Sequence, residues 1–498
     1  MTRPTQVALA LVATLLAYTA LASAQLPPLA DRLPADTVGY ASWQPRLVNP
    51  ANPLVALWTD PGFAPARAAL ERRLDQWIQK NPVLQGISAH ELLALAGHAT
   101  LLGGGRKSTG GQRNLFFVAQ AQDSVGRELL QKLAAAVRAP WRAGLNECGV
   151  LIAASTSAEF LDLSDRYRCG ASPTTPLAAT SLYQQARAVL GQPAAEVYVD
   201  LQRAIQPEGS QQGAERLRRQ VHWEQLHAFV VGIGLSGPAA EIRTSALGDT
   251  APGSLLDLFG VNVQSSEWAT LRALPPEASF EVFHLDLTAL QKEMAPVLEL
   301  VPATPQAARA SAFIQAALTL LQQAFTGEIA LAWNRAPRSA AELVVAGLRN
   351  PQALQNLLQT TLAPLVVPEG NDGGVALYRL GGAPASAGAA PVRLAVTPTL
   401  LVAGRDAEAV RRAAASSLHP STTSVESNPH IQELKGELPS ELLALTYLNL
   451  ETLDWTAGRR TTATAPLVDP SVFRRHLHWL GGGAWRDAQG IHGRAWLH

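Results

Sequence analysis

One short phrase recurs along this chain and limits where its strands can begin. A Leu-Pro pair leads through small, polar or acidic residues into an apolar run that ends on a short polar residue. The residue before a proline favours extended backbone, and proline is tolerated at the start of a strand, so the phrase predicts strand starts. It begins at Leu33, Leu274 and Leu438, with a weaker form at Pro193. Four strand starts of one kind predict a duplicated architecture.

The spacing of these phrases divides the chain into two halves. Pro193 follows Pro34 by 159 residues. Pro439 follows Pro275 by 164 residues. Unrelated halves would agree so closely only by chance, so we expect two repeats, at residues 25–265 and 270–498. The length of 498 residues also favours two or more cores over one.

Within each half, several consecutive strands have no helix between them. Paired strands are expected at 95–102 with 115–121, 229–235 with 241–246, 392–396 with 400–403, and 476–484 with 490–497. Helices are expected at 64–78, 123–137, 157–167, 288–300, 307–324 and 406–414. The pattern predicts an α+β fold of two tandem pseudo-repeats, each an antiparallel sheet with helices packed mainly on one face. A doubly wound parallel sheet is disfavoured.

The N-terminus has the pattern of a signal peptide. Arg3 precedes an apolar or small-residue run from Val7 to Leu21, and a small-x-small triplet ends at Ala24. We therefore expect cleavage of residues 1–24 and a mature chain that starts at Gln25. The alternative is an uncleaved membrane anchor, for which the run is short against the roughly 20 apolar residues of a span. No other stretch is apolar enough to cross a bilayer, so we expect no stable span in the mature chain.

Cys148 and Cys169 are the two cysteines of the chain. In an oxidising compartment two cysteines are expected to pair. A strand over 149–154 and a returning helix over 157–167 have legs of roughly 15–20 Å each, so their outer ends can meet. The sequence therefore predicts a structural disulfide, with two free buried thiols as the alternative.

The charge balance restricts the partners. Lys and Arg total 40 and Asp and Glu total 40, and basic residues occur at most in pairs. This balance argues against nucleic acid or an anionic membrane surface as the main partner. An unknown envelope protein or a small ligand remains, and no cofactor is expected.

Two local motifs resemble known sites but lack an essential element. His90-Glu91 opens like a zinc-protease helix, yet Ala94 stands where the second His is required. The stretch Gly103–Gly110 resembles a phosphate loop, but Arg106 precedes Lys107 and a strand follows. We interpret the first as a surface helix start and the second as a hairpin loop.

A histidine cluster near the C-terminus offers the strongest candidate for a metal site. His476 and His478 are two residues apart on an expected strand, and His492 lies on its partner strand. Three imidazoles could hold Zn²⁺ with one position open for catalysis. The alternative is a terminal hairpin with solvent-facing histidines.

Short polar residues recur where expected strands end. Asp200, Asp286 and Asn449 stand there, with Gln44 in a similar register. Converging carboxylates could perform acid–base chemistry, but each position precedes an expected helix, where such side chains cap free N–H groups. We interpret them as caps, and we expect a capping box in which Thr156 and Glu159 bond each other's backbone N–H.

These strand-start phrases resemble a family of secreted bacterial envelope proteins catalogued as a domain of unknown function. The resemblance rests on Leu33–Val38 with Tyr40, and on Asn428–Leu434 running into Leu438-Pro439 and Tyr447–Leu450. It implies export and a repeated α+β body, and it carries over no catalytic residue.

Three functional hypotheses follow. The first is a non-enzymatic exported protein, periplasmic or extracellular, that binds or scaffolds a partner in the cleft between its halves. The second is a metal-dependent hydrolase that uses the C-terminal histidines. The third is a structural accessory of the cell wall or surface layer.

Overall fold

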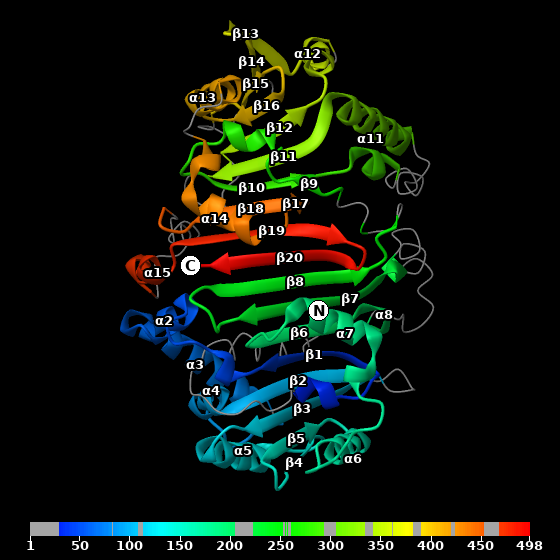
Figure 1. The fold of residues 1–498 in the computed structure, drawn as a ribbon, viewed down its shortest axis with the longest axis vertical. Coiled ribbons are helices and arrows are strands. Elements are labelled where there is room, and N and C mark those ends of the chain that lie inside the picture. The colour runs from blue at the N-terminus through cyan, green and yellow to red at the C-terminus, as the bar shows by residue number, and fades with distance from the viewer. Residues whose placement is uncertain are drawn as a thin grey trace.

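The computed structural model describes most of the chain. The described residues are 29–81, 83–107, 113–204, 223–251, 254, 256, 260–292, 305–333, 342–360, 362–381, 390–419, 424–452 and 468–498. Within them, one antiparallel sheet of 18 strands runs the length of the molecule (Figure 1), beside a separate two-stranded pair. The fold is α+β, as the strand pattern predicts. The expected signal peptide and its cleavage position, Ala24–Gln25, lie outside the described residues.

The N-terminal half supplies one end of the sheet. Its strands are β1 (Thr37–Trp43), β2 (Ala99–Lys107), β3 (Arg113–Ala121), β4 (Arg142–Leu145), β5 (Val150–Ala154), β6 (Ala195–Asp200), β7 (Leu226–Gly234) and β8 (Ala240–Gly248). From the outer edge towards the middle, their spatial order is β4-β5-β3-β2-β1-β6-β7-β8.

The C-terminal half supplies the other end. Its strands are β10 (Ser279–His284), β11 (Phe325–Trp333), β12 (Leu343–Leu348), β13 (Val366–Asp372), β14 (Val375–Leu380), β15 (Arg393–Val396), β16 (Leu400–Gly404), β18 (Ala444–Asn449), β19 (Trp479–Asp487) and β20 (Gly490–Leu497). From its outer edge inwards, the order is β13-β14-β15-β16-β12-β11-β10-β18-β19-β20. The short strands β9 (Val263–Gln264) and β17 (Glu441–Leu442) form the separate pair.

The two ends join through their last strands. β8 and β20 pair antiparallel along the whole of β20, so segments about half a chain apart lie side by side at the centre (Figure 1). The expectation of a separate sheet in each half is therefore wrong. Hydrogen bonding between β8 and β20 satisfies the inner edge that each half would otherwise expose.

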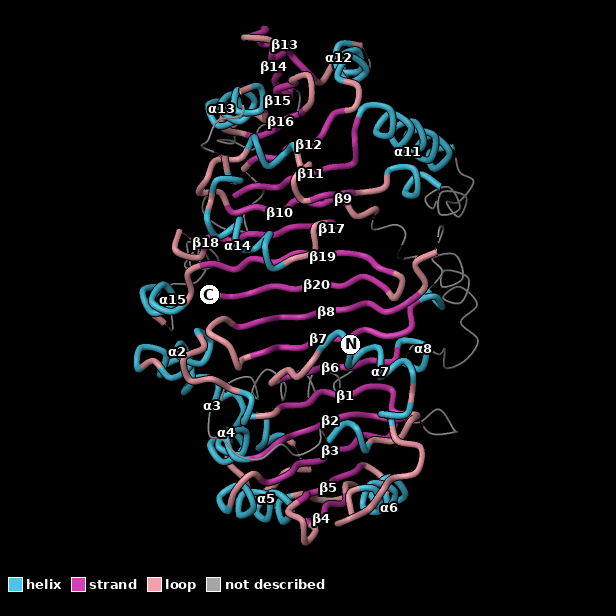
Figure 2. Tube along the Cα trace, in the orientation of Figure 1, coloured by secondary structure: helices cyan, strands magenta, loops and turns pink. Residues whose placement is uncertain are grey.

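Helices flank the strands along the length of the sheet (Figure 2), and the buried clusters place them on both of its faces. They are α2 (Pro53–Thr59), α3 (Ala64–Lys80), α4 (Ala89–His98), α5 (Ser124–Ala136), α6 (Ser157–Arg166), α7 (Ser181–Leu190), α8 (Leu201–Ala204), α11 (Pro305–Ala324), α12 (Pro351–Gln359), α13 (Ala407–Leu418), α14 (Pro429–Glu437) and α15 (Pro470–His476). In β2, Leu101 packs in the core under α4 and α5, whereas its neighbour Leu102 packs in the core under α6 and α7. Successive strand residues point to opposite faces, so the expectation of helices mainly on one face is wrong.

The C-terminal half repeats this two-sided packing. α13 and α14 cover one face over Phe280 and Val345, and α12 covers the other over Leu348. Tracing the register across the middle strands places the α6–α7 and α13–α14 helices on the same face. We call this face A, and the face under α4, α5 and α12 face B.

One hydrophobic core crosses the boundary between the halves. Val472 and Leu477, at α15, pack in the same cluster as Trp43 and Leu57 of the N-terminal half. Above this contact, the Asp60 carboxylate, which follows α2, accepts hydrogen bonds from Arg475 (3.1 Å) and His476 (2.8 Å). The two halves are thus joined by apolar packing as well as by the sheet.

Several element boundaries differ from expectation; β2 runs on to Lys107 and α13 to Leu418, and two strand starts also differ. The strand expected from Leu95 begins at Ala99, because residues 89–98 form α4, and apolar residues lie on both sides of the Gly97-His98 pair that ends this helix. The hairpin expected from His476 begins at Trp479, because α15 ends at His476. Among the described residues, no helix is both long enough and apolar enough to span a membrane.

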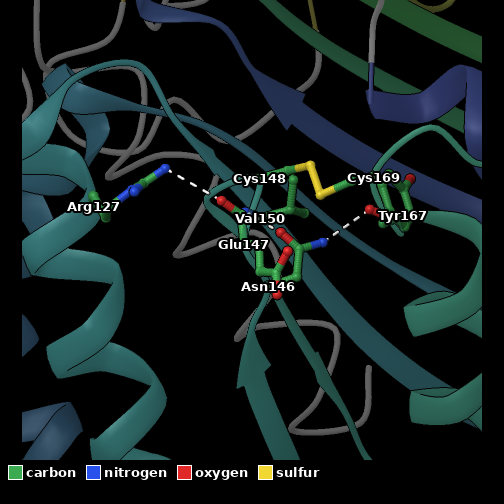
Figure 3. The surroundings of a disulfide bond; sticks show 7 residues. All are labelled: Arg127, Asn146, Glu147, Cys148, Val150, Tyr167 and Cys169. Carbon is green, nitrogen blue, oxygen red and sulfur yellow. Dashed lines mark hydrogen bonds between the residues drawn. A yellow bond between two sulfur atoms is a disulfide. The ribbon is translucent and has the colours of Figure 1, made fainter.

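The predicted disulfide is confirmed. Cys148 and Cys169 are bonded with their Cα atoms 5.9 Å apart, within the usual range for a disulfide. Figure 3 shows how the loop before β5 is held beside the end of α6. The Asn146 side chain donates to the carbonyl of Tyr167 and accepts from the N–H of Val150, each at 2.9 Å. This loop is therefore fixed by hydrogen bonds as well as by the covalent link.

Candidate functional site: a polar cleft between the halves

A polar cleft of about 460 Å³ lies on face A, over the central strands. Its floor comes from β8, β20 and β19, and α7 and α14 stand on either side (Figure 1). The cleft therefore lies at the junction of the two halves, where the sequence predicts the main contact region. Its volume falls within the range of small-molecule sites, about 300–1,000 Å³.

Strand register brings charged and aromatic side chains together on the floor. Arg243 of β8 lies directly opposite Arg494 of β20. Ser245 lies opposite His492, which in turn lies opposite Trp485 of β19. Directly opposed residues of antiparallel strands share a face, so these side chains form two adjacent rows.

The cleft wall at α14 is built from the recurring Leu-Pro phrase. Glu437 ends α14, and Leu438 and Pro439 follow it along the wall. A Cβ atom at Gly483 of β19 would lie 2.8 Å from Cδ1 of Leu438. A side chain at position 483 would therefore displace the Leu438 side chain from the floor.

A carboxylate lies between the two guanidinium groups. Glu241 accepts two hydrogen bonds from Arg243, at 2.9 and 3.1 Å, and one from Arg494. Burial acts to raise the pKa of Glu241, but the two arginines outweigh it, so this pKa is lowered. Arg494 also stacks over Trp496 with its Cζ 4.5 Å from the ring centroid, which fixes its direction.

Ser245, His492 and Asp487 form a chain that resembles a serine-hydrolase triad. The Ser245 hydroxyl is 2.9 Å from Nδ1 of His492, and Nε2 of His492 is 2.9 Å from Asp487. Ser245 is only 1% exposed and does not line the cleft, whereas half of the Asp487 side chain is exposed. The end of the chain that a ligand can reach is the carboxylate, so this arrangement does not present a nucleophile.

Hydrogen bonds to His492 and Gln489 also determine the charge of Asp487. Burial acts to raise the pKa of Asp487, but hydrogen bonds from the Gln489 N–H and from His492 lower it overall. Asp487 is therefore ionised at neutral pH. Both ring nitrogens of His492 are engaged, so neither is left to bind a metal or accept a proton from a ligand.

The structure separates the three histidines of the predicted zinc site. His476 bonds to Asp60, His478 bonds to Glu451 at 2.9 Å, and His492 bonds within the cleft. His478 pairs with the far end of β20, so it lies about 20 Å from His492 at the rise of a strand. The three imidazoles do not converge as the hypothesis of a zinc site requires, and no metal-binding group of three or more ligands occurs among the described residues.

His478 instead lies near two other histidines. Trp479 stacks between His430 and His498, with ring centroids 5.1 and 4.1 Å away. Burial lowers the pKa of His498, and the nearby His430 and His478 lower it further against the opposing effect of Glu433. His430, His478 and Trp479 of this group line a smaller hollow beside α14.

The two motifs interpreted as structural have structural roles. Glu91 forms a capping box with Ser88 at the start of α4, which accounts for the His90-Glu91 pair. The glycines of Gly103–Gly105 lie within β2, and the remainder of that loop, 108–112, is outside the described residues.

The interpretation of the strand-end polar residues as helix caps is confirmed for Asp200 and Asp286, whereas Asn449 makes the same kind of bond in a turn with no helix in the described residues 450–452 that follow it. Asp200 accepts from the N–H of Arg203, Asp286 from those of Thr288 and Ala289, and Asn449 from that of Glu451. Gln44 also precedes a helical turn, but its side chain makes no capping bond.

The capping box expected at Thr156 is only half formed. The Thr156 oxygen accepts from the N–H of Glu159, as predicted. The Glu159 carboxylate, however, accepts hydrogen bonds from Arg106 of β2 instead of turning back to the cap. A charged partner from another element thus overrides the local motif.

The residues of the cleft were not predicted individually from the sequence. Glu241, Arg243 and Ser245 alternate along β8 with Ile242 and Thr244, which marks one polar face of a strand. That signal predicts a polar face but not its partner. The pairing of β8 with β20, which creates the cleft, has no local signature.

Comparison of the chain with models of known families, with curated proteins and with solved structures finds no match.

Proposed function

We propose that this chain is an exported, non-enzymatic binding protein of the cell envelope, and that the cleft on face A holds its ligand. The observation that carries the proposal is the mixture of side chains around Trp485. Arg243, Arg494, Asp487 and Glu437 line the cleft together with this indole. Convergent polar groups around an apolar surface are the usual composition of a ligand site.

Charge balance in the cleft favours a ligand without strong net charge. Two arginines face three carboxylates, those of Glu241, Glu437 and Asp487. A strongly anionic or cationic ligand would meet repulsion from one set as it met attraction from the other. We infer a neutral, hydroxyl-rich ligand, a saccharide of about two units, given a volume near the lower part of the range for small-molecule sites.

The chemistry of such a ligand fits the side chains. Neighbouring sugar hydroxyls present paired donors and acceptors, which the planar carboxylate and guanidinium groups can bond two at a time. The apolar face of a sugar ring can lie on Trp485, whose large rigid surface contributes contact area at low entropic cost.

Titration of the mature chain with a disaccharide of N-acetylated hexosamines tests this proposal. Calorimetry and tryptophan emission should both report saturable binding to one site. Replacing the indole with Trp485→Ala should weaken binding about tenfold, because the lost apolar contact area adds to the about 0.5–1.5 kcal/mol that a stacked ring contributes.

Trp141→Phe is the matched control, because Trp141 lies on face B and away from the cleft. It should leave saccharide affinity unchanged. Binding of a dipeptide such as Ala-Ala with no binding of the disaccharide would refute the saccharide assignment. Binding of neither would refute the small-ligand function and favour a protein partner.

We propose further that the two halves arose by duplication. The additional hairpin β13–β14 is left aside, and the remaining eight strands of each half are ranked in chain order. From the outer edge to the centre, the ranks then follow the same sequence in both halves. Superposition of 33–250 on 274–498 tests this, and strands that align out of chain order would refute it.

Export also remains a proposal, supported by the N-terminal sequence and by the disulfide. It predicts that the purified chain from the cell envelope starts at Gln25 on N-terminal sequencing. Recovery of a chain with an intact Arg3 segment from membranes would favour an uncleaved anchor. The likeness to secreted envelope proteins of unknown function rests on the strand-start phrases alone.

A further inference from the structure

A second pocket lies on face B of the N-terminal half. Its lining is almost wholly apolar, whereas most of the residues that line the cleft on face A are polar. It has a volume of about 170 Å³ between α3, α4, α5 and the sheet. Its floor includes Leu101, Leu151 and Ala153, and two indoles, Trp77 and Trp141, stand at its sides. Asn81 is the one polar residue among those that line it.

Ordered water molecules find too few hydrogen-bond partners in a pocket with this lining. A buried water needs two to four polar partners, and among the lining side chains only that of Asn81 is a strongly polar one. Native interiors also hold few voids larger than a single water molecule. An apolar cavity of about 150 Å³ in another protein stays dry and binds benzene, so about 170 Å³ is large enough for six or seven carbon atoms.

The rim of the pocket is formed by two short paired segments. Leu84 bridges to Val137, the Gln85 N–H donates to the carbonyl of Ala136 (3.0 Å), and the Arg138 N–H donates to that of Val83 (2.9 Å). These bonds fix the opening. They leave the partly exposed side chains of Trp77 and Trp141 between the pocket and solvent.

The charge around this rim is positive. Lys80, Arg138 and Arg142 are exposed and flank the lining residues Asn81, Val137 and Trp141. Within the described residues, no carboxylate forms an ion pair with any of these three cations, and residues 80–85 and 137–142 contain no Asp or Glu. An apolar interior with a basic rim complements a single hydrocarbon tail that ends in an anion.

We propose that this pocket binds a free medium-chain fatty acid of about seven or eight carbons, with its tail on Leu101 and Ala153 and its carboxylate beside Arg138. The site is separate from the polar cleft, so the proposal stands or falls independently of the saccharide function.

Calorimetric titration of the mature chain with hexanoate, octanoate and decanoate tests the proposal. One molecule should bind per chain, and affinity should rise about fourfold per added methylene until the tail fills the pocket. Octanol, which lacks the charge, should bind more weakly than octanoate, and Arg138→Ala should remove most of that difference.

A filling substitution distinguishes the pocket from other surfaces. Ala153→Leu places extra carbon atoms in the space and should weaken octanoate binding at least tenfold while leaving the Tm unchanged or raised. Ala135→Leu makes the same change on the exposed side of α5 and should not affect binding. If Ala153→Leu fails to fold by circular dichroism, Leu92→Phe fills the pocket from α4.

Two results would overturn the proposal. One is the absence of saturable octanoate binding below its micelle concentration. The other is equal affinity in a folded filling variant and in Ala135→Leu.

Discussion

The Glu241 carboxylate separates two guanidinium groups that register brings face to face. Without that negative charge, Arg243 and Arg494 would be like charges on directly opposed positions of neighbouring strands, which is destabilising. Three charge-assisted hydrogen bonds converge on this one side chain. Glu241 is therefore the residue on which the conformation of the cleft floor depends most.

Glu241→Gln should lower the free energy of unfolding by about 1–3 kcal/mol at pH 7. The pKa of Glu241 is lowered in the folded protein, from an ordinary value of 4.5. The stabilisation is thus fully present above about pH 4.5 and is lost as the pH falls through the lowered pKa. Urea unfolding at pH 7, 5 and 3.5 should show that the difference in free energy of unfolding between wild type and variant is smallest at pH 3.5.

Glu128→Gln is the control, because Glu128 pairs with Lys132 at 3.7 Å and is 71% exposed. An exposed pair of this kind contributes about 0–1 kcal/mol. The stabilising role of Glu241 would be contradicted if Glu241→Gln lowered the free energy of unfolding by no more than Glu128→Gln does. It would also be contradicted if the loss grew as the pH falls.

Single residues show why local chemistry predicted the caps but not the cleft. Asp286 caps the residues next to it, so its role depends on a few neighbouring positions. Glu159 occupies an equally clear motif, yet Arg106, 53 residues away in the chain, takes its carboxylate. Arg243 and Arg494 meet only through long-range pairing, which no short window of sequence contains.

At the scale of elements, predictions held where a breaker marks the boundary. Asn350 and Pro351 mark the start of α12, and Asp123 marks that of α5. The boundary between α4 and β2 was missed although Gly97 stands beside it, because apolar residues lie on both sides of the Gly97-His98 pair. Strand β13 was missed because its residues are mostly polar and exposed, without the alternation that identifies a half-buried strand.

The disulfide joins the loop before β5 to the segment that follows α6. Its cysteines are 21 residues apart, a loop whose closure corresponds to about 3 kcal/mol in the chain-entropy account. The double variant Cys148→Ala with Cys169→Ala should therefore have a free energy of unfolding about 3 kcal/mol lower, measured by urea unfolding.

Reductant provides the control for this comparison. It should move the wild-type midpoint to that of the double variant and leave the variant itself unchanged. Equal midpoints for oxidised wild type and variant would mean that the hydrogen bonds of Asn146 alone hold the loop.

At the scale of the whole molecule, the sequence predicted the α+β class and the antiparallel strands. It did not predict that both halves share one sheet. Hydrophobic alternation assigns each strand a buried face, but it does not say which edge strand will meet which. The shared core adds a second link, since Val472 of α15 packs with residues of the N-terminal half.

This continuity predicts a single cooperative transition in calorimetry of the full chain. Val472→Ala removes buried methyl groups from the shared core and should lower the free energy of unfolding by about 1–3 kcal/mol. The variant should still unfold in one transition. Two resolved transitions, of which the variant shifts only one, would show that the halves unfold independently.

The pairing of β8 with β20 also determines when the sheet can finish folding. A chain that emerges N-terminus first presents β8 long before residues 490–497 exist to cover it. The inner edge of the early half stays open to improper partners throughout that interval. Maturation of this protein therefore waits on its final eight-residue strand, and a helper that shields the open edge would act in the period before that strand arrives.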